Sequence, residues 1–175
     1  MEELKYPVGR VSFPEQITQE MIQGWIANIE AFPTAVEEEV RDLDTHQLQY
    51  RYRPEGWTIH QVVNHCADSH TNSLIRFKWV LTEDKPTIKP YFEARWAELP
   101  DTLDYPVQEG VALLKQLHKR WVFLLKNLTP EQLERTYVHP EKGLTFDLKQ
   151  TICQYDWHCR HHLQHIKNAK EFKYS

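Results

Sequence analysis

Hydrophobic residues recur at intervals of three and four residues along four long stretches of the chain. This spacing places them on one face of an α-helix and is typical of helices that pack against a core. The four stretches cover about residues 18–44, 58–82, 106–128 and 147–172. Pro33 lies inside the first stretch, and because proline lacks the N–H donor of a helix interior, we expect it to kink or split that helix.

Polar residues mark the starts of two of these helices. Thr58 is followed three residues later by Gln61, which is the spacing of a capping box. Asp147 and Gln150 have the same spacing and predict the start of the last helix. Four long amphipathic helices predict an all-α fold, an antiparallel four-helix bundle.

The connections between these helices differ in length. Residues 83–105 are rich in proline and aromatic residues and predict a long crossover that covers one end of the bundle or crosses it. A short helical turn at residues 131–134 and a hairpin-like insertion at residues 137–146 are expected before the last helix. The chain has 175 residues and no internal repeat, so we expect one domain over residues 1–175.

Composition excludes several classes of function. The chain has 21 Lys and Arg against 25 Asp and Glu, so it lacks the basic surface typical of nucleic-acid-binding proteins. Its five glycines form no dinucleotide-binding or phosphate-binding loop. No signal peptide, Cys-x-x-Cys pair or apolar run of about 18 residues is present. We therefore expect a cytoplasmic protein that binds neither nucleic acid nor membranes.

Seven of the ten histidines lie in two of the predicted helices. They are His60, His65 and His70 in the second helix, and His158, His161, His162 and His165 in the last. Two histidines four residues apart on a helix can bind one metal ion. His158 and His162 have this spacing and lie at the apolar stripe, whereas His161 points further out. His165 lies on the side of this pair and could orient it.

A third ligand from the second helix would complete the three-ligand pattern of catalytic metal sites. His70 lies within the apolar stripe and His65 at its margin, so periodicity favours His70. A histidine in such a stripe can equally be a core residue with a local hydrogen bond, and the histidines of the last helix can be a solvated face. The residues alone therefore leave the third ligand open.

Three segments of the chain resemble the DinB/YfiT-like family of metalloenzymes. They are GWTIHQVVNHCADSH (residues 56–70), NSLIRFK (residues 72–78) and WHCRHH (residues 157–162). The resemblance implies a four-helix bundle that holds a divalent metal ion, zinc or nickel, on three histidines, and a homodimer. Carried over residue by residue, it implies His65, His158 and His162 as the metal ligands.

The chain departs from the family pattern at two positions. Relatives often have two histidines where this chain has Asn64 and His65, and many have glutamine where it has His165. No glutamate follows His158, so the His-Glu-x-x-His motif of zinc peptidases is absent.

The resemblance implies a metal-dependent hydrolase. A divalent ion on three neutral imidazoles would lower the pKa of bound water to about 7 and so create a hydroxide nucleophile. The YfiT branch also resembles bacillithiol S-transferases. In these enzymes a low-molecular-weight thiol binds the metal as a thiolate and attacks an electrophile. The third alternative is a metal-binding bundle without catalytic activity. We expect a small-molecule substrate and a divalent metal cofactor, with zinc ahead of nickel.

Two further residues of the second helix are candidate catalytic residues. Asp68 could act as a base or orient a ligand, although it points away from the apolar stripe and a solvated carboxylate is the simpler interpretation. Arg76 and Asn72 lie on the side of His65 and could bind a substrate carboxylate or phosphate. An ordinary surface arginine is an equally good interpretation of Arg76.

Overall fold

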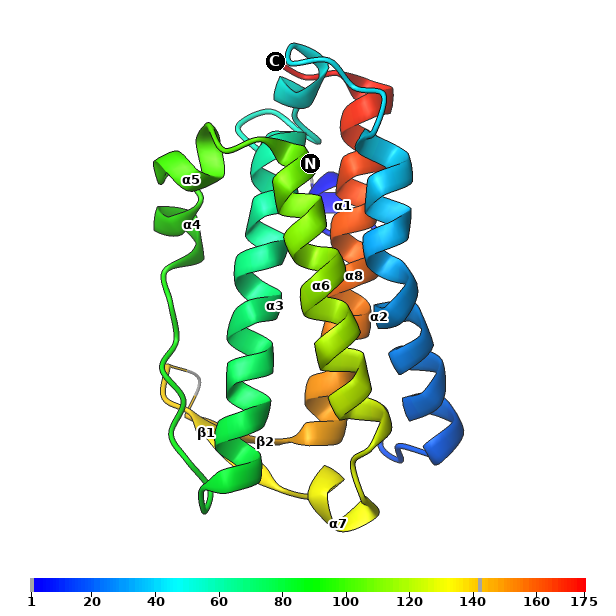
Figure 1. The fold of residues 1–175 in the computed structure, drawn as a ribbon, viewed down its shortest axis with the longest axis vertical. Helices are drawn as coiled ribbons and strands as arrows, with labels where there is room; N and C mark the ends of the chain where they lie inside the picture. The colour runs from blue at the N-terminus through cyan, green and yellow to red at the C-terminus, as the bar shows by residue number, and fades with distance from the viewer. Residues whose placement is uncertain (1, 142) are drawn as a thin grey trace.

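A computed structural model describes residues 2–141 and 143–175, so Met1 and Lys142, in the predicted turn, lie outside the described residues. Four long helices run along the long axis of the molecule (Figure 1). They are α2 (Gln19–Val40), α3 (Ile59–Thr82), α6 (Val107–Lys126) and α8 (Leu148–Phe172). Helix α2 packs against α6 and α8, and α3 packs against the same two helices. The predicted all-α four-helix bundle is confirmed.

The long crossover determines the direction of the helices. Helices α2 and α8 run one way and α3 and α6 the other, so each helix is antiparallel to one neighbour and parallel to the other (Figure 1). The crossover returns the chain along the outside of α3 and contains α4 (Glu93–Trp96) and α5 (Pro100–Leu103). Both short helices contact α3, so the crossover covers one side of the bundle.

Short elements lie at the two ends of the bundle and beside it. At the ends are η1 (Gln47–Gln49), α7 (Pro130–Leu133), β1 (Thr136–His139) and β2 (Leu144–Asp147), whereas α1 (Glu2–Lys5) lies beside α8 (Figure 1). Strands β1 and β2 pair in an antiparallel hairpin with Thr136 opposite Asp147. The predicted turn and hairpin before the last helix are therefore confirmed, whereas the pattern did not predict α1 or η1.

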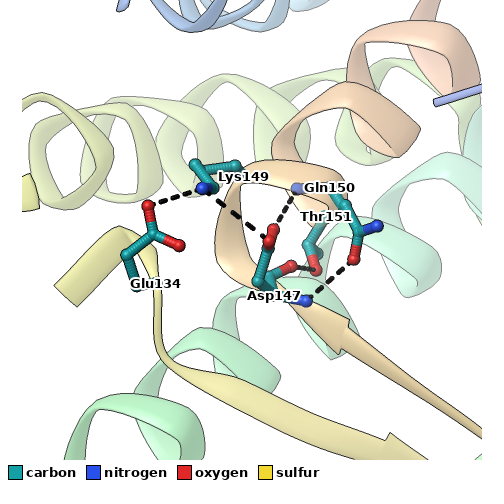
Figure 2. Close-up of polar contacts among 5 residues, drawn as sticks. All are labelled: Glu134, Asp147, Lys149, Gln150 and Thr151. Atoms are coloured by element: carbon teal, nitrogen blue, oxygen red, sulfur yellow. Dashed lines mark hydrogen bonds and ion pairs between the residues drawn. The ribbon is translucent and has the colours of Figure 1, made fainter. Parts of the chain in front are cut away.

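Asp147 fixes the start of α8 (Figure 2). Its Oδ1 atom accepts a hydrogen bond from the Gln150 amide (2.7 Å), and its own amide donates to Gln150 Oε1 (3.0 Å). The Thr151 hydroxyl donates to the Asp147 carbonyl (2.8 Å), and Lys149 forms an ion pair with Glu134. The predicted capping box is confirmed, and it sets the register of the helix that carries four histidines.

Thr58 and Gln61 form the other predicted capping box at the start of α3. The Gln61 amide donates to the Thr58 hydroxyl (3.1 Å), and the Thr58 amide donates to Gln61 Oε1 (3.0 Å). The Gln61 side chain also donates to the Ala97 carbonyl in the crossover (2.9 Å). This contact ties the crossover to the helix that carries His65.

Helix α2 runs through Pro33 without a break, so the expected split is wrong. Pro33 has no N–H to donate to the carbonyl of Ile29, four residues earlier. Instead, Nδ1 of His118 in α6 donates a hydrogen bond to this carbonyl (2.7 Å). The neighbouring helix thus replaces the donor that proline removes, and Pro33 itself is buried.

The core combines aromatic and aliphatic side chains with buried histidines. Its largest fully buried side chains include Trp121, Tyr137, Phe77, Ile29, His70 and His165. None of the helices within residues 2–141 and 143–175 has the length and hydropathy that a membrane span requires.

Candidate metal centre

His65 of α3 and His158 and His162 of α8 converge on one point. One ring nitrogen from each lies within 4.8 Å of the other two. The ring centroids are 4.4 Å apart for His158 and His162, 4.8 Å for His65 and His162, and 5.4 Å for His65 and His158. The structure therefore brings together the three histidines that the family resemblance implied, in an arrangement that could hold one metal ion.

His70 lies beside this group, and Cys66, His70 and His158 form a second set of atoms within 4.8 Å of one another. Burial raises the pKa of the Cys66 thiol, which disfavours the thiolate that a metal ion requires. Both ring nitrogens of His70 also face other histidines. The group of His65, His158 and His162 is therefore the better candidate metal centre.

A chain of hydrogen bonds connects His158 to the backbone of α2. His118 Nδ1 lies 2.7 Å from the Ile29 carbonyl, and His118 Nε2 lies 2.7 Å from His70 Nδ1. His70 Nε2 lies 3.0 Å from His158 Nδ1. Because a carbonyl only accepts, neutral His118 donates from Nδ1 and accepts at Nε2, so His70 and His158 also donate from Nδ1. The lone pair of His158 is then on Nε2, the nitrogen that lies 3.4 Å from the Ser69 hydroxyl and that could bind a metal ion.

A second chain connects His162 to the N-terminal segment. His165 Nε2 lies 3.3 Å from the Lys5 carbonyl, and His165 Nδ1 lies 3.3 Å from His162 Nδ1. By the same reasoning, His165 donates from Nε2 and accepts from Nδ1 of His162. Tyr52 stacks on the His165 ring at 3.7 Å between centroids. His165 is thus placed to orient His162, as its position in the sequence suggested, rather than to be a fourth ligand.

His161 is buried, at 7% exposure, although the helical pattern predicted that it points outward. The ring of Tyr6, next to α1, lies 6.0 Å from the His161 ring, and Trp157 stacks on it at 4.4 Å. The prediction was wrong because the N-terminal segment packs across this face of α8. His161, His162 and His165 also form a group of atoms within 4.8 Å, all from the one helix.

The candidate centre opens into a cleft of about 560 Å³. The N-terminal segment, the loop before α3, and helices α3, α4 and α8 line this cleft. A second cavity of about 490 Å³ adjoins it, and His158, Gln154, Glu93 and Ala94 line both spaces. An ion held by three histidines beside such a cleft could keep an open coordination position, which is the pattern of catalytic rather than structural zinc sites.

Burial keeps the three candidate ligands neutral. It lowers the pKa of His65 to about 3, with a smaller contribution from nearby His161. Burial and the neighbouring histidines also lower the pKa values of His158 and His162 well below the usual range. Neutral imidazole is the form that binds metal ions, so the centre needs no deprotonation near neutral pH.

We expect the free energy of unfolding of the metal-free protein to fall as the pH drops from about 6.5 to about 4. Burial lowers the pKa values of His118 and His161 to about 4, whereas unfolded histidines titrate near 6.5. Unfolding therefore takes up protons in this range, at about 1.4 kcal/mol per pH unit for each proton. The stabilisation is complete above about pH 6.5 and is lost toward the folded pKa values.

Urea unfolding at about pH 7.5, 5.5 and 4.5 measures this dependence. A free energy of unfolding that stays constant over these three conditions would contradict the neutral, buried histidines.

The two other candidate residues lie in different surroundings. Asp68 is half-buried, and burial, with the charge of Asp101, raises its pKa to about 6. Neither Asp68 nor Asn72 is among the described residues that line the cleft or the adjoining cavity. Arg76 is buried and lines the adjoining cavity, so it is not an exposed surface arginine.

Sequence reasoning did not single out His118, which anchors the hydrogen-bond chain to His158. A signal was present, because His118 lies four residues after Leu114 and three before Trp121, on the apolar face of α6. Lys5 and Tyr52, which contact His165, lie outside the long helices and had no such signal.

Three comparisons with known proteins agree with this description. Residues 28–166 match the model of the DinB superfamily. A relative from Bacillus cereus strain 03BB102 is 50% identical over 171 residues, and one from Bacillus mycoides strain KBAB4 is 49% identical over 171 residues. Each match covers 98% of this chain and 98% of the relative, and both relatives carry the name "Putative metal-dependent hydrolase". The solved structure of YfiT from Bacillus subtilis, described as a probable metal-dependent hydrolase with an unusual four-helix bundle topology, covers 99% of both chains with a TM-score of 0.94 and 40% identity.

Proposed function

Because the chain belongs to the DinB superfamily and to its YfiT branch, we propose that it is a metal-dependent hydrolase whose ion is held by His65, His158 and His162. The observation that supports this proposal is the convergence of three neutral imidazoles beside an open cleft. A divalent ion on such ligands supplies a Lewis acid and lowers the pKa of bound water to about 7.

The donor set fits this role. Three imidazoles suit zinc, and also nickel, so we propose zinc as the resident ion with nickel as the alternative. His158 contacts His70, and His162 contacts His165, through Nδ1, so the lone pairs of His158 and His162 are on Nε2 and could bind an ion. The chain is thus equipped to orient two ligands before an ion binds.

The cleft also contains groups that can bind and deprotonate a small molecule. Glu55 and Glu93 line it, and a carboxylate there could accept a proton from a water molecule in the cleft. Trp57 lies beside the candidate ligands, with its ring 4.6 Å from that of His65, and can exclude water from one side. These carboxylates are candidates for the general base in place of Asp68, which is not among the described residues that line the cleft.

We expect the zinc-loaded protein to hydrolyse at least one member of a panel of small esters, amides and phosphoesters. Activity should be independent of added thiol, lost on chelation and restored by zinc, with zinc content followed by elemental analysis. The same panel with electrophiles and a low-molecular-weight thiol tests the alternative function. Turnover only with thiol would assign an S-transferase, and stoichiometric zinc without turnover on any substrate would favour a non-catalytic bundle.

A further inference from the structure

A buried guanidinium group lines the cavity next to the candidate metal centre. Arg76 of α3 is 8% exposed and lines the cavity of about 490 Å³. A guanidinium group keeps its positive charge when it is buried. Among residues 2–141 and 143–175, no carboxylate forms an ion pair with Arg76. This charge is therefore buried without a counter-ion from the described protein.

The surroundings of Arg76 hold the side chain without neutralising it. Its guanidinium carbon lies over the Tyr137 ring, 5.5 Å from the centroid. Among the residues that the structure describes, the other charged side chains that line the cavity, apart from the histidines, are Arg95, Glu93 and Glu141, and all three are exposed to solvent. Arg76 is thus the buried charge among the described residues that line the cavity, and water screens the exposed charges at the rim.

The cavity extends from the candidate metal centre along α3. Arg76 follows His65 by eleven residues, which is about three helical turns and about 16 Å along the axis on the same face. His158 lines both the cleft and the cavity, so the two spaces meet at a candidate ligand. Ser69 and Tyr155, which both carry hydroxyl groups, line the same cavity as Arg76 and His158.

We propose that this cavity binds the anionic end of the substrate, a carboxylate or phosphate group held by Arg76, while the reacting group lies at the metal centre. The proposal rests on the proposed function. A buried charge is costly unless an anion compensates it, and planar guanidinium can bind either oxyanion through two hydrogen bonds. The substrate is then an elongated, anionic small molecule rather than a neutral or cationic one.

Ligands with a metal-binding group at one end test this proposal without a protein variant. We would titrate the zinc-loaded protein with monohydroxamates of linear dicarboxylic acids of increasing length, and with counterparts that end in a neutral amide. At the best length, the carboxylate should bind about ten-fold more tightly than the amide. A third series that ends in a phosphonate distinguishes a carboxylate site from a phosphate site.

Protein variants then test whether Arg76 causes the preference for the carboxylate ligand over the amide ligand. Arg76→Gln should bind the carboxylate and the amide with equal affinity, and Arg76→Lys should keep part of the preference because it keeps the charge. Arg120→Gln, which removes an exposed arginine of α6, is the matched control and should keep the full preference. The melting temperature of Arg76→Gln shows whether the variant remains folded, because this substitution also removes the contact of Arg76 with the Tyr137 ring.

Equal binding of the carboxylate and the amide by the wild-type protein at every length would overturn the proposal. The same holds if the preference survives in Arg76→Gln. If the wild type retains no zinc, the proposed function fails. Binding of succinate and inorganic phosphate to the metal-free protein then tests the anion cavity by itself. Binding that Arg76→Gln abolishes would support the anion cavity, and no binding of either probe would overturn it.

Discussion

His158→Ala, His162→Ala and His65→Ala should each abolish stoichiometric zinc binding. Each substitution removes one of three imidazoles whose nitrogens lie within 4.8 Å of one another. The two that remain leave the ion with an incomplete set of protein ligands. The affinity should therefore fall by more than the 10–100-fold that is typical of losing an outer hydrogen-bond partner. Elemental analysis after dialysis, with a chelator competition titration, measures the loss.

His46→Ala is the matched control, because His46 is exposed and lies in the loop before η1. It should bind zinc as the wild type does. Cys66→Ser tests the competing group of Cys66, His70 and His158 and should also retain zinc. Loss of zinc in Cys66→Ser, together with retention in His65→Ala, would assign the metal to that second group.

His70→Leu should bind zinc about 10–100-fold more weakly than the wild type without losing the site. His70 is not one of the three proposed ligands, but its Nε2 atom lies 3.0 Å from Nδ1 of His158. Without this acceptor, His158 loses the hydrogen bond that fixes its tautomer and its ring orientation. Part of the population would then carry the proton on Nε2, the nitrogen that we expect to bind the ion.

The weaker affinity should appear in a competition titration, and nitrogen-15 spectra of the histidine rings should show the change of tautomer. In the wild type, His158 should carry its proton on Nδ1, whereas His70→Leu should show both tautomers. His60→Leu is the control, since His60 lies on the same helix but contacts the Tyr105 carbonyl instead. Wild-type affinity and an unchanged His158 spectrum in His70→Leu would refute the hydrogen-bond chain.

The helices were predictable because they depend on residues close together in the sequence. The periodicity of apolar residues located all four long helices, and the two capping boxes placed the first residues of α3 and α8. Each capping box joins residues only three positions apart, so no tertiary contact is needed to form it.

The candidate centre was predictable only in part. The pair His158 and His162 is visible from the sequence, because residues four apart share one face of a helix. Periodicity then favoured His70 over His65, and His70 is indeed the more deeply buried, at 0% against 3% exposure. How deeply a histidine is buried does not decide whether its ring lies opposite both His158 and His162 of α8. The ring of His65 does, whereas His70 contacts Nδ1 of His158. The family resemblance, and not the helical pattern, indicated His65.

The sequence by itself determined where the four long helices lie, where α3 and α8 begin, and that His158 and His162 share a face of α8. Only the tertiary structure decided how those histidines are oriented and what surrounds them. The Ile29 carbonyl, left without a helical donor by Pro33, accepts a hydrogen bond from His118, 89 residues later in the chain. Lys5 contacts His165 across 160 residues. Such contacts form only when separate helices and loops pack together, so no local pattern of residues encodes them.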